Sequence, residues 1–168
     1  MLMRFITMLF CGLMLSPSVQ AASKGQITVK GALKESLNSM LKVASDLHTS
    51  CYEQNEPKIA THLKSLSVSI QRVQRTGELS NQQNPHLNKI LDAIQSQIKI
   101  IQNSNHIDKK ENLKNAFRQL VQIVKVYKLD SYRVFFCSKD RSVWMQKSWK
   151  PQNPISPEKY KDCGKPVR

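Results

Sequence analysis

Glycine is scarce in this chain, with five residues in 168, and only Gly25, Gly31, Gly77 and Gly164 follow residue 21. The sequence contains no glycine-rich phosphate loop, no C-x-x-C redox pair and no nucleophile elbow. It also lacks a pair of carboxylates in an apolar context. Because nucleotide-binding enzymes, thiol oxidoreductases and serine hydrolases depend on these features, we expect that the protein is not an enzyme.

Long hydrophobic runs are also missing. The longest is the apolar run at residues 5–15, which follows Arg4 and precedes the small-residue pattern ending at Ala21. A helix needs about 20 apolar residues to cross a bilayer, so this run is too short. We predict a cleavable signal peptide at residues 1–21, a periplasmic or secreted protein, and no transmembrane segment after cleavage.

Acidic residues are few, with 12 Asp and Glu against 26 Lys and Arg. After loss of Arg4 the chain keeps 25 basic and 12 acidic residues, a net charge of +13. In an exported protein this excess favours acidic envelope partners over nucleic acid. The alternative is that the charge only keeps the protein soluble.

Four segments carry apolar residues that alternate at spacings of four and three. A repeat averaging 3.5 residues keeps one stripe facing the same neighbours in a bundle of nearly antiparallel helices. We therefore predict an all-α fold, an up-down four-helix bundle over residues 22–130. The four stripes are Leu33, Leu37, Met40, Ala44, Leu47 and Cys51; Ile59, Leu63, Leu66, Ile70 and Val73; Leu87, Leu91, Ile94, Ile98 and Ile101; and Leu113, Phe117, Leu120, Val124 and Tyr127.

The chain changes character after Asp130, where prolines and both tryptophans gather. Alternating side chains predict a short strand at residues 132–137, with a second at residues 143–146. The rest of this segment is predicted to be a loop that contains several prolines. Another loop, polar in character, is predicted at residues 78–84 between the second and third helices. Residues 131–168 are thus predicted to form a small irregular or β-hairpin cap within the same domain.

Three cysteines follow the predicted signal peptide: Cys51, Cys137 and Cys163. A bridge between Cys137 and Cys163 would close a loop of about 26 residues. On the chain-entropy model, such a bridge stabilises the folded protein by roughly 3 to 4 kcal/mol. The other interpretation is a soft-metal site that uses both thiolates. Cys51 stands on the first apolar stripe, where a free cysteine behaves as a small hydrophobe.

The tail resembles a family of small periplasmic helical domains of unknown function, which occur alone or fused to adaptor subunits of copper and silver efflux systems. The matching residues are Cys137, Trp144, Asn153, Pro154, Cys163 and Gly164. The likeness covers residues 110–165. It implies a non-enzymatic periplasmic binding module related to copper or another heavy metal. Where the family carries two methionines, however, this sequence has Lys139 and Tyr160.

The remaining metal-ligating candidates are Met145 beside Trp144, and the pair His48 and Cys51, three residues apart on the first helix. The structural alternative is that all three pack in the core. A thioether suits copper(I), whereas an ammonium or a phenol does not, so any soft-metal site here is degenerate. No cofactor is otherwise expected.

A basic patch with interleaved aromatic residues is the second candidate site. Its cationic members are Lys139, Arg141, Lys147, Lys150, Lys159, Lys161 and Lys165. Such a mixture can hold polyanions or stack on rings. The sequence therefore leaves two functional hypotheses: a binding module with a degenerate soft-metal site, and a disulfide-stapled interaction protein whose basic surface binds an acidic partner or envelope polyanion. The alternative for the patch is that its aromatic residues only cover the bundle.

Overall fold

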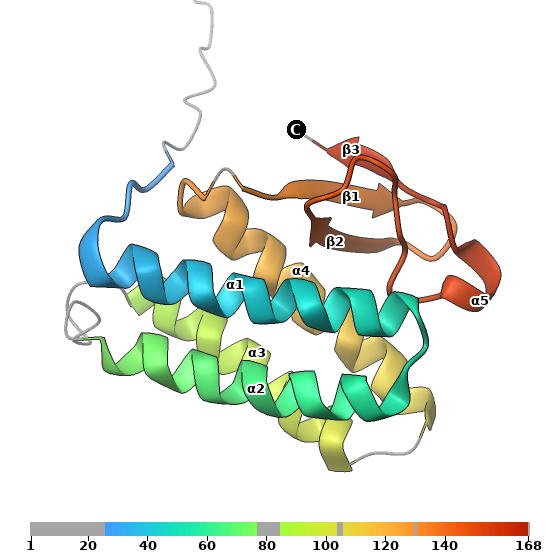
Figure 1. The fold of residues 1–168 in the computed structure, drawn as a ribbon, viewed down its shortest axis with the longest axis horizontal. Helices are drawn as coiled ribbons and strands as arrows, with labels where there is room; N and C mark the ends of the chain where they lie inside the picture. The colour runs from blue at the N-terminus through green and yellow to red at the C-terminus, as the bar shows by residue number, and fades with distance from the viewer. Residues whose placement is uncertain (1–25, 77–84, 104–105, 130, 168) are drawn as a thin grey trace, which may run out of the picture.

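A computed structural model describes residues 26–76, 85–103, 106–129 and 131–167. The predicted signal peptide at residues 1–21 and the predicted polar loop at residues 78–84 lie outside these ranges. Within them, four main helices pack pairwise and are followed by a small antiparallel sheet (Figure 1).

The four helices are α1 (Gly31–Tyr52), α2 (Glu56–Arg75), α3 (Pro85–Asn103) and α4 (His106–Val126). The predicted bundle is confirmed, and its core is made by the predicted stripes. All the stripe residues are buried except Ile59 and Leu113, which are partly buried. Packing of the 3.5-residue stripes thus accounts for the helical body.

A three-residue turn, residues 53–55, reverses the chain between α1 and α2. The Asn55 side chain accepts a hydrogen bond from the backbone N–H of Lys58 at 3.1 Å and so caps α2. Pro57 occupies the first turn, where its missing N–H costs nothing. These two local devices fix the start of α2 and bring it back along α1.

The bundle consists of two close pairs, α1 with α2 and α3 with α4. Polar side chains help to join α2 to α3. Gln74 Nε2 donates to Asp92 Oδ1 at 2.8 Å, and Gln95 Nε2 donates to Ser67 Oγ. The pairing follows from the connections, because the short α1–α2 turn makes those two helices antiparallel neighbours.

The C-terminal segment forms strands β1 (Arg133–Cys137), β2 (Ser142–Gln146) and β3 (Lys165–Val167), with the short helix α5 (Pro157–Tyr160) before β3. The strand order is β2-β1-β3, and both pairings are antiparallel. The predicted hairpin is confirmed. The third strand was not predicted: its residues Lys165, Pro166 and Val167 are all exposed and carry no apolar alternation.

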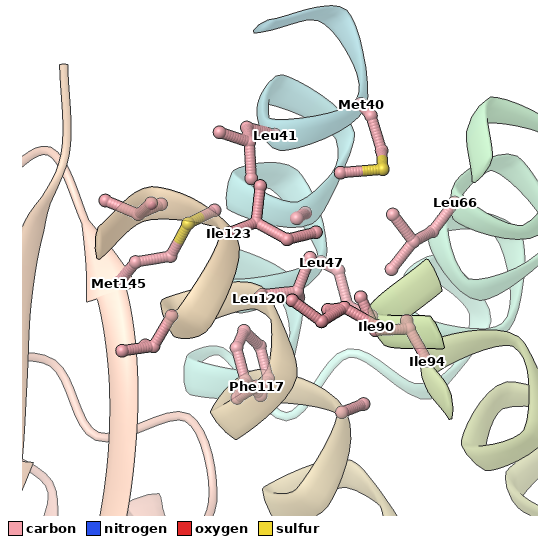
Figure 2. Packing of buried hydrophobic residues seen from close by; sticks show 14 of the residues in the cluster. Met40, Leu41, Leu47, Leu66, Ile90, Ile94, Phe117, Leu120, Ile123 and Met145 are labelled. Carbon is pink, nitrogen blue, oxygen red and sulfur yellow. The ribbon is translucent and has the colours of Figure 1, made fainter. Parts of the chain in front are cut away.

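The sheet lies on one side of the bundle, where β2 packs against α4 and also contacts α1 (Figure 1). Figure 2 shows Met145 reaching from β2 toward α4, in the neighbourhood of Ile123 and Phe117. Buried residues of the helices and of the sheet form one continuous hydrophobic cluster. The cap is therefore part of the same core as the bundle.

The segment before α1 runs beside the end of α4. Ile27 N–H donates to the Val126 carbonyl at 2.7 Å, and Lys128 N–H donates to the Ile27 carbonyl at 3.0 Å. Val29, two residues on, is buried in the core. The beginning of α1 is thereby tied to the end of α4. Among the described residues, no helix has the length and apolarity to cross a membrane.

Candidate functional site in the disulfide-closed cap

The predicted bridge between Cys137 and Cys163 is present. The bonded sulfurs join the end of β1 to the residues just before β3, with the two Cα atoms 5.3 Å apart. Cys137 is completely buried, and Cys163 packs partly buried against the core. In this oxidised state neither sulfur is a thiolate, the form that binds soft metals.

Asn153 organises the loop inside the bridge. Its side chain is fully buried; Oδ1 accepts from the backbone N–H groups of Ile155 (2.8 Å) and Ser156 (3.3 Å). Its Nδ2 donates to Asp140 Oδ2 at 2.9 Å. The backbone N–H of Asn153 donates to the Lys161 carbonyl. The side chain and backbone of Asn153 together hold three parts of the cap, so this motif residue has a structural role.

Asp140 completes this network from the β1–β2 turn. Its Oδ1 accepts from both the backbone N–H (3.0 Å) and the hydroxyl (2.6 Å) of Ser142. Partial burial would raise the pKa of Asp140, but the hydrogen bonds from Ser142 and Asn153 outweigh it and lower that pKa. The carboxylate stays ionised inside the cap and takes no part in surface charge pairing.

Trp144 packs the sheet against the loop of the cap, beside Gly164 and Pro151. The indole is completely buried and stacks on Phe135 with ring centroids 6.0 Å apart. Its Nε1 donates to Gln146 Oε1 at 2.7 Å, which also accepts from the Gln152 backbone N–H. A buried indole needs such a partner for its N–H, and buried Gln146 supplies it.

Gly164 is required by close packing. A Cβ at this position would lie 2.8 Å from Pro151 Cβ and 2.9 Å from Trp144 Cη2, closer than atoms can approach without displacement. Pro154, the remaining motif residue, is buried beside Asn153. The motif residues of the tail thus build and close the cap.

His48, Cys51 and Met145 are all buried in the core. His48 is buried, meets Phe117 edge-on, and its Nε2 lies 2.8 Å from the Gln152 carbonyl. Since a carbonyl only accepts, Nε2 carries the proton. Burial lowers the pKa of His48 to about 4. Burial, and secondarily the charge of Glu56, raises the pKa of the Cys51 thiol.

Met145 is completely buried against α4 and reaches the core from the sheet (Figure 2). In the part of the chain that the structure describes, no three His, Cys, Asp or Glu side chains lie close enough together to hold a metal ion. The positions proposed as metal ligands are therefore occupied by a disulfide, a neutral histidine, a protonated thiol and a packed thioether.

The seven predicted patch residues are all exposed: Lys139, Arg141, Lys147, Lys150, Lys159, Lys161 and Lys165. Several of these cations lie near aromatic rings. Lys139 lies over Tyr160, Lys147 over Tyr132, and Lys161 over Tyr52 of α1, with each ammonium 5.3 to 5.7 Å from the ring centroid. These contacts orient the ammonium groups without neutralising them.

Arg133 and Trp149 form the most exposed aromatic feature of the cap. The guanidinium carbon lies 3.6 Å from the Trp149 ring centroid, while Arg133 Nη1 donates to the Lys147 carbonyl at 2.6 Å. Trp149 is 74% exposed, so it does not cover the bundle as one interpretation of the sequence supposed. Arg133 was missed in the sequence because its stacking partner lies 16 residues away.

Cavities border the cap on two sides of the described structure. A shallow one of about 220 Å³ is lined by Trp149, Arg133 and β3 residues. The other, of about 420 Å³, lies where residues 154–158 cross the end of the bundle formed by the α1–α2 turn, the end of α3 and the start of α4. Cys51 is one of the residues that line this cavity. The cavity was not indicated by the spacing of residues in the sequence, because its wall comes from distant segments.

Comparison of this chain with protein-family models, with curated proteins and with solved structures finds no match. The likeness of the tail to the efflux-associated domains therefore remains a prediction.

Replacing Gly164 with Ala tests the packing of the cap. The added methyl must displace Pro151 or the Trp144 indole, and we expect a loss of about 1 to 3 kcal/mol in the free energy of unfolding. Urea denaturation of the oxidised protein measures it. The neighbouring exposed Lys165→Ala substitution is the control and should change stability by less than about 0.5 kcal/mol. Equal effects of the two substitutions would contradict the close packing.

His48 makes stability depend on pH. Its folded pKa of about 4 lies below the ordinary value of 6.5, so between these values the unfolded chain binds a proton that the folded chain does not. Stability therefore falls on acidification, with a contribution from His48 on the order of 3 kcal/mol between pH 7 and pH 4. Urea titrations across this range should show a smaller decline for His48→Gln. Parallel curves for the two proteins would refute the assignment.

Proposed function

We propose that this chain is a non-enzymatic interaction protein of the periplasm whose disulfide-closed cap presents a basic surface to an acidic partner. One observation carries the proposal: residues 131–167 hold eight Lys and Arg but only three acidic residues, and all three acids already have partners. Asp140 is bonded within the cap, Glu158 pairs with Lys110 at 2.9 Å, and Asp162 pairs with Lys150 at 3.8 Å.

The loop that carries much of the basic surface is held in place by covalent and hydrogen bonds. The disulfide and the network around Asn153 hold the loop that carries Lys150, Lys159 and Lys161. A cationic surface held in place loses less side-chain and loop freedom on binding than a mobile basic tail does. Trp149 adds a large apolar face next to the Arg133 guanidinium, a combination enriched at interaction surfaces.

The hypothesis of a soft-metal module receives less support from this arrangement. Metal binding through Cys137 and Cys163 requires that the bridge first be reduced and that both thiols lose their protons. Neither Lys139 nor Tyr160 offers a soft donor at the positions of the family's methionines. We therefore favour the interaction role.

Matched lysine variants test the interaction role. One protein carries Gln at the exposed cap positions Lys147, Lys150, Lys161 and Lys165; the control carries Gln at the exposed bundle positions Lys42, Lys64, Lys89 and Lys99. Both have the same net charge. With dextran sulfate as a polyanion probe, we expect about tenfold weaker binding for the cap variant and a reduced dependence on salt, because close cationic groups act together. Neutral dextran should bind neither protein.

The bundle variant should retain nearly the affinity of the unaltered protein. Equal losses in the two variants would mean that net charge alone drives binding, and the cap would then have no special role.

Thiol titration separates the bridge from the metal site. In unreduced protein that lacks residues 1–21, we expect one thiol per chain, that of Cys51, and slow reaction until the protein is unfolded because this thiol is buried. Three reactive thiols in protein taken directly from its compartment would instead favour a metal site at Cys137 and Cys163.

A further inference from the structure

The cavity of about 420 Å³ between the bundle end and the cap has the size and lining of a small-molecule site. Its volume falls within the range of about 300 to 1,000 Å³ usual for such sites. Six segments of the chain converge on it: the end of α1, the α1–α2 turn, the start of α2, the end of α3, the first turns of α4 and residues 154–158. We refer to it as the junction cavity.

Apolar side chains make most of the wall of the junction cavity. Of all the residues on the four predicted stripes, only Ile59 and Leu113, which both line this cavity, are partly buried, whereas the others are buried. Ile101 and Ile155, which are buried, line it as well. The core is therefore incompletely covered at this cavity, and an apolar ligand would complete the burial of these side chains.

The charges at the junction cavity are not equivalent. Lys110 and Glu158 neutralise each other across it in an ion pair of 2.9 Å. Glu56 is exposed and stands in the first turn of α2, where the helix dipole stabilises an acid. Lys109 is partly buried, and no described residue forms an ion pair with it. Lys109 is thus the cation available to a ligand.

We propose that the junction cavity binds a small molecule with an unbranched apolar body and one carboxylate, such as a medium-chain fatty acid. The apolar body would contact Ile59 and Leu113, and the carboxylate would pair with Lys109. The Cys51 thiol, whose pKa is raised by burial, stays protonated and contributes an apolar surface to the cavity. Glu56 opposes the carboxylate and weakens binding.

Three eight-carbon probes test the proposal on the oxidised protein: octanoate, 1-octanol and octylamine, each titrated while amide NMR shifts are recorded. We expect saturable binding of octanoate, with shifts at Cys51 and Ile155, weaker binding of 1-octanol at the same amides, and no binding of octylamine there. Equal affinities for all three probes, or no saturable shift at these amides with octanoate, would overturn the proposal.

Charge variants sharpen the test. Lys109→Met should weaken the binding of octanoate about tenfold, the usual contribution of a hydrogen bond to a charged group, and should leave the affinity for 1-octanol unchanged. Glu56→Gln should raise the affinity for octanoate by roughly twofold to threefold, because it removes a nearby negative charge that repels the carboxylate. Lys64→Met, an exposed lysine on α2 outside the cavity, is the matched control and should change neither affinity.

The same series separates this site from the basic surface of the cap. The variant with Gln at Lys147, Lys150, Lys161 and Lys165 should bind octanoate normally, and Lys109→Met should bind dextran sulfate normally. Leu113→Trp, which fills the junction cavity, should abolish the binding of octanoate and of 1-octanol. Retained octanoate affinity in both Lys109→Met and Leu113→Trp would refute the assignment.

Discussion

The covalent link between Cys137 and Cys163 is the constraint on which the cap depends, because the loop it closes contains little regular structure. Between the two sulfurs the chain forms only β2 and the four-residue helix α5. Closing this loop lowers the conformational entropy of the unfolded chain, which on the chain-entropy model raises the free energy of unfolding by roughly 3 to 4 kcal/mol. The buried polar groups of Asn153 and Gln146 can then meet their partners at fixed positions.

The same constraint explains how so basic a segment stays folded against the bundle. Lysines repel one another and favour an expanded chain. Here most apolar residues of β1 and β2 are buried in the core that the sheet shares with the bundle, and the disulfide prevents the charged loop from separating. The few carboxylates are consumed inside the cap or in ion pairs, so the outer face keeps its excess of positive charge.

The sequence alone predicted the bundle, because the spacing of the apolar residues shows which face of each helix is buried. It also identified the pairing of Cys137 with Cys163, the hairpin and the exposed lysines. Strand β3 could not be foreseen, because its three residues are exposed and include Pro166, which lacks the backbone N–H that a strand usually donates. The spacing of His48 and Cys51 correctly placed them on one helix, but whether that face meets a metal or Phe117 is decided by tertiary packing.

The junction cavity shows most clearly why site prediction from the sequence stopped short. Its wall comes from segments that are far apart in the chain, and its existence depends on how residues 154–158 cross the bundle. Residues 154–156 cross the bundle end as irregular chain held by Asn153, and Pro157 then opens the one-turn helix α5. An irregular crossing covers the helix ends less completely than a helix packed into their grooves would, which leaves Ile59 and Leu113 partly uncovered. The features that close the cap therefore also create the space in which a ligand could complete the core.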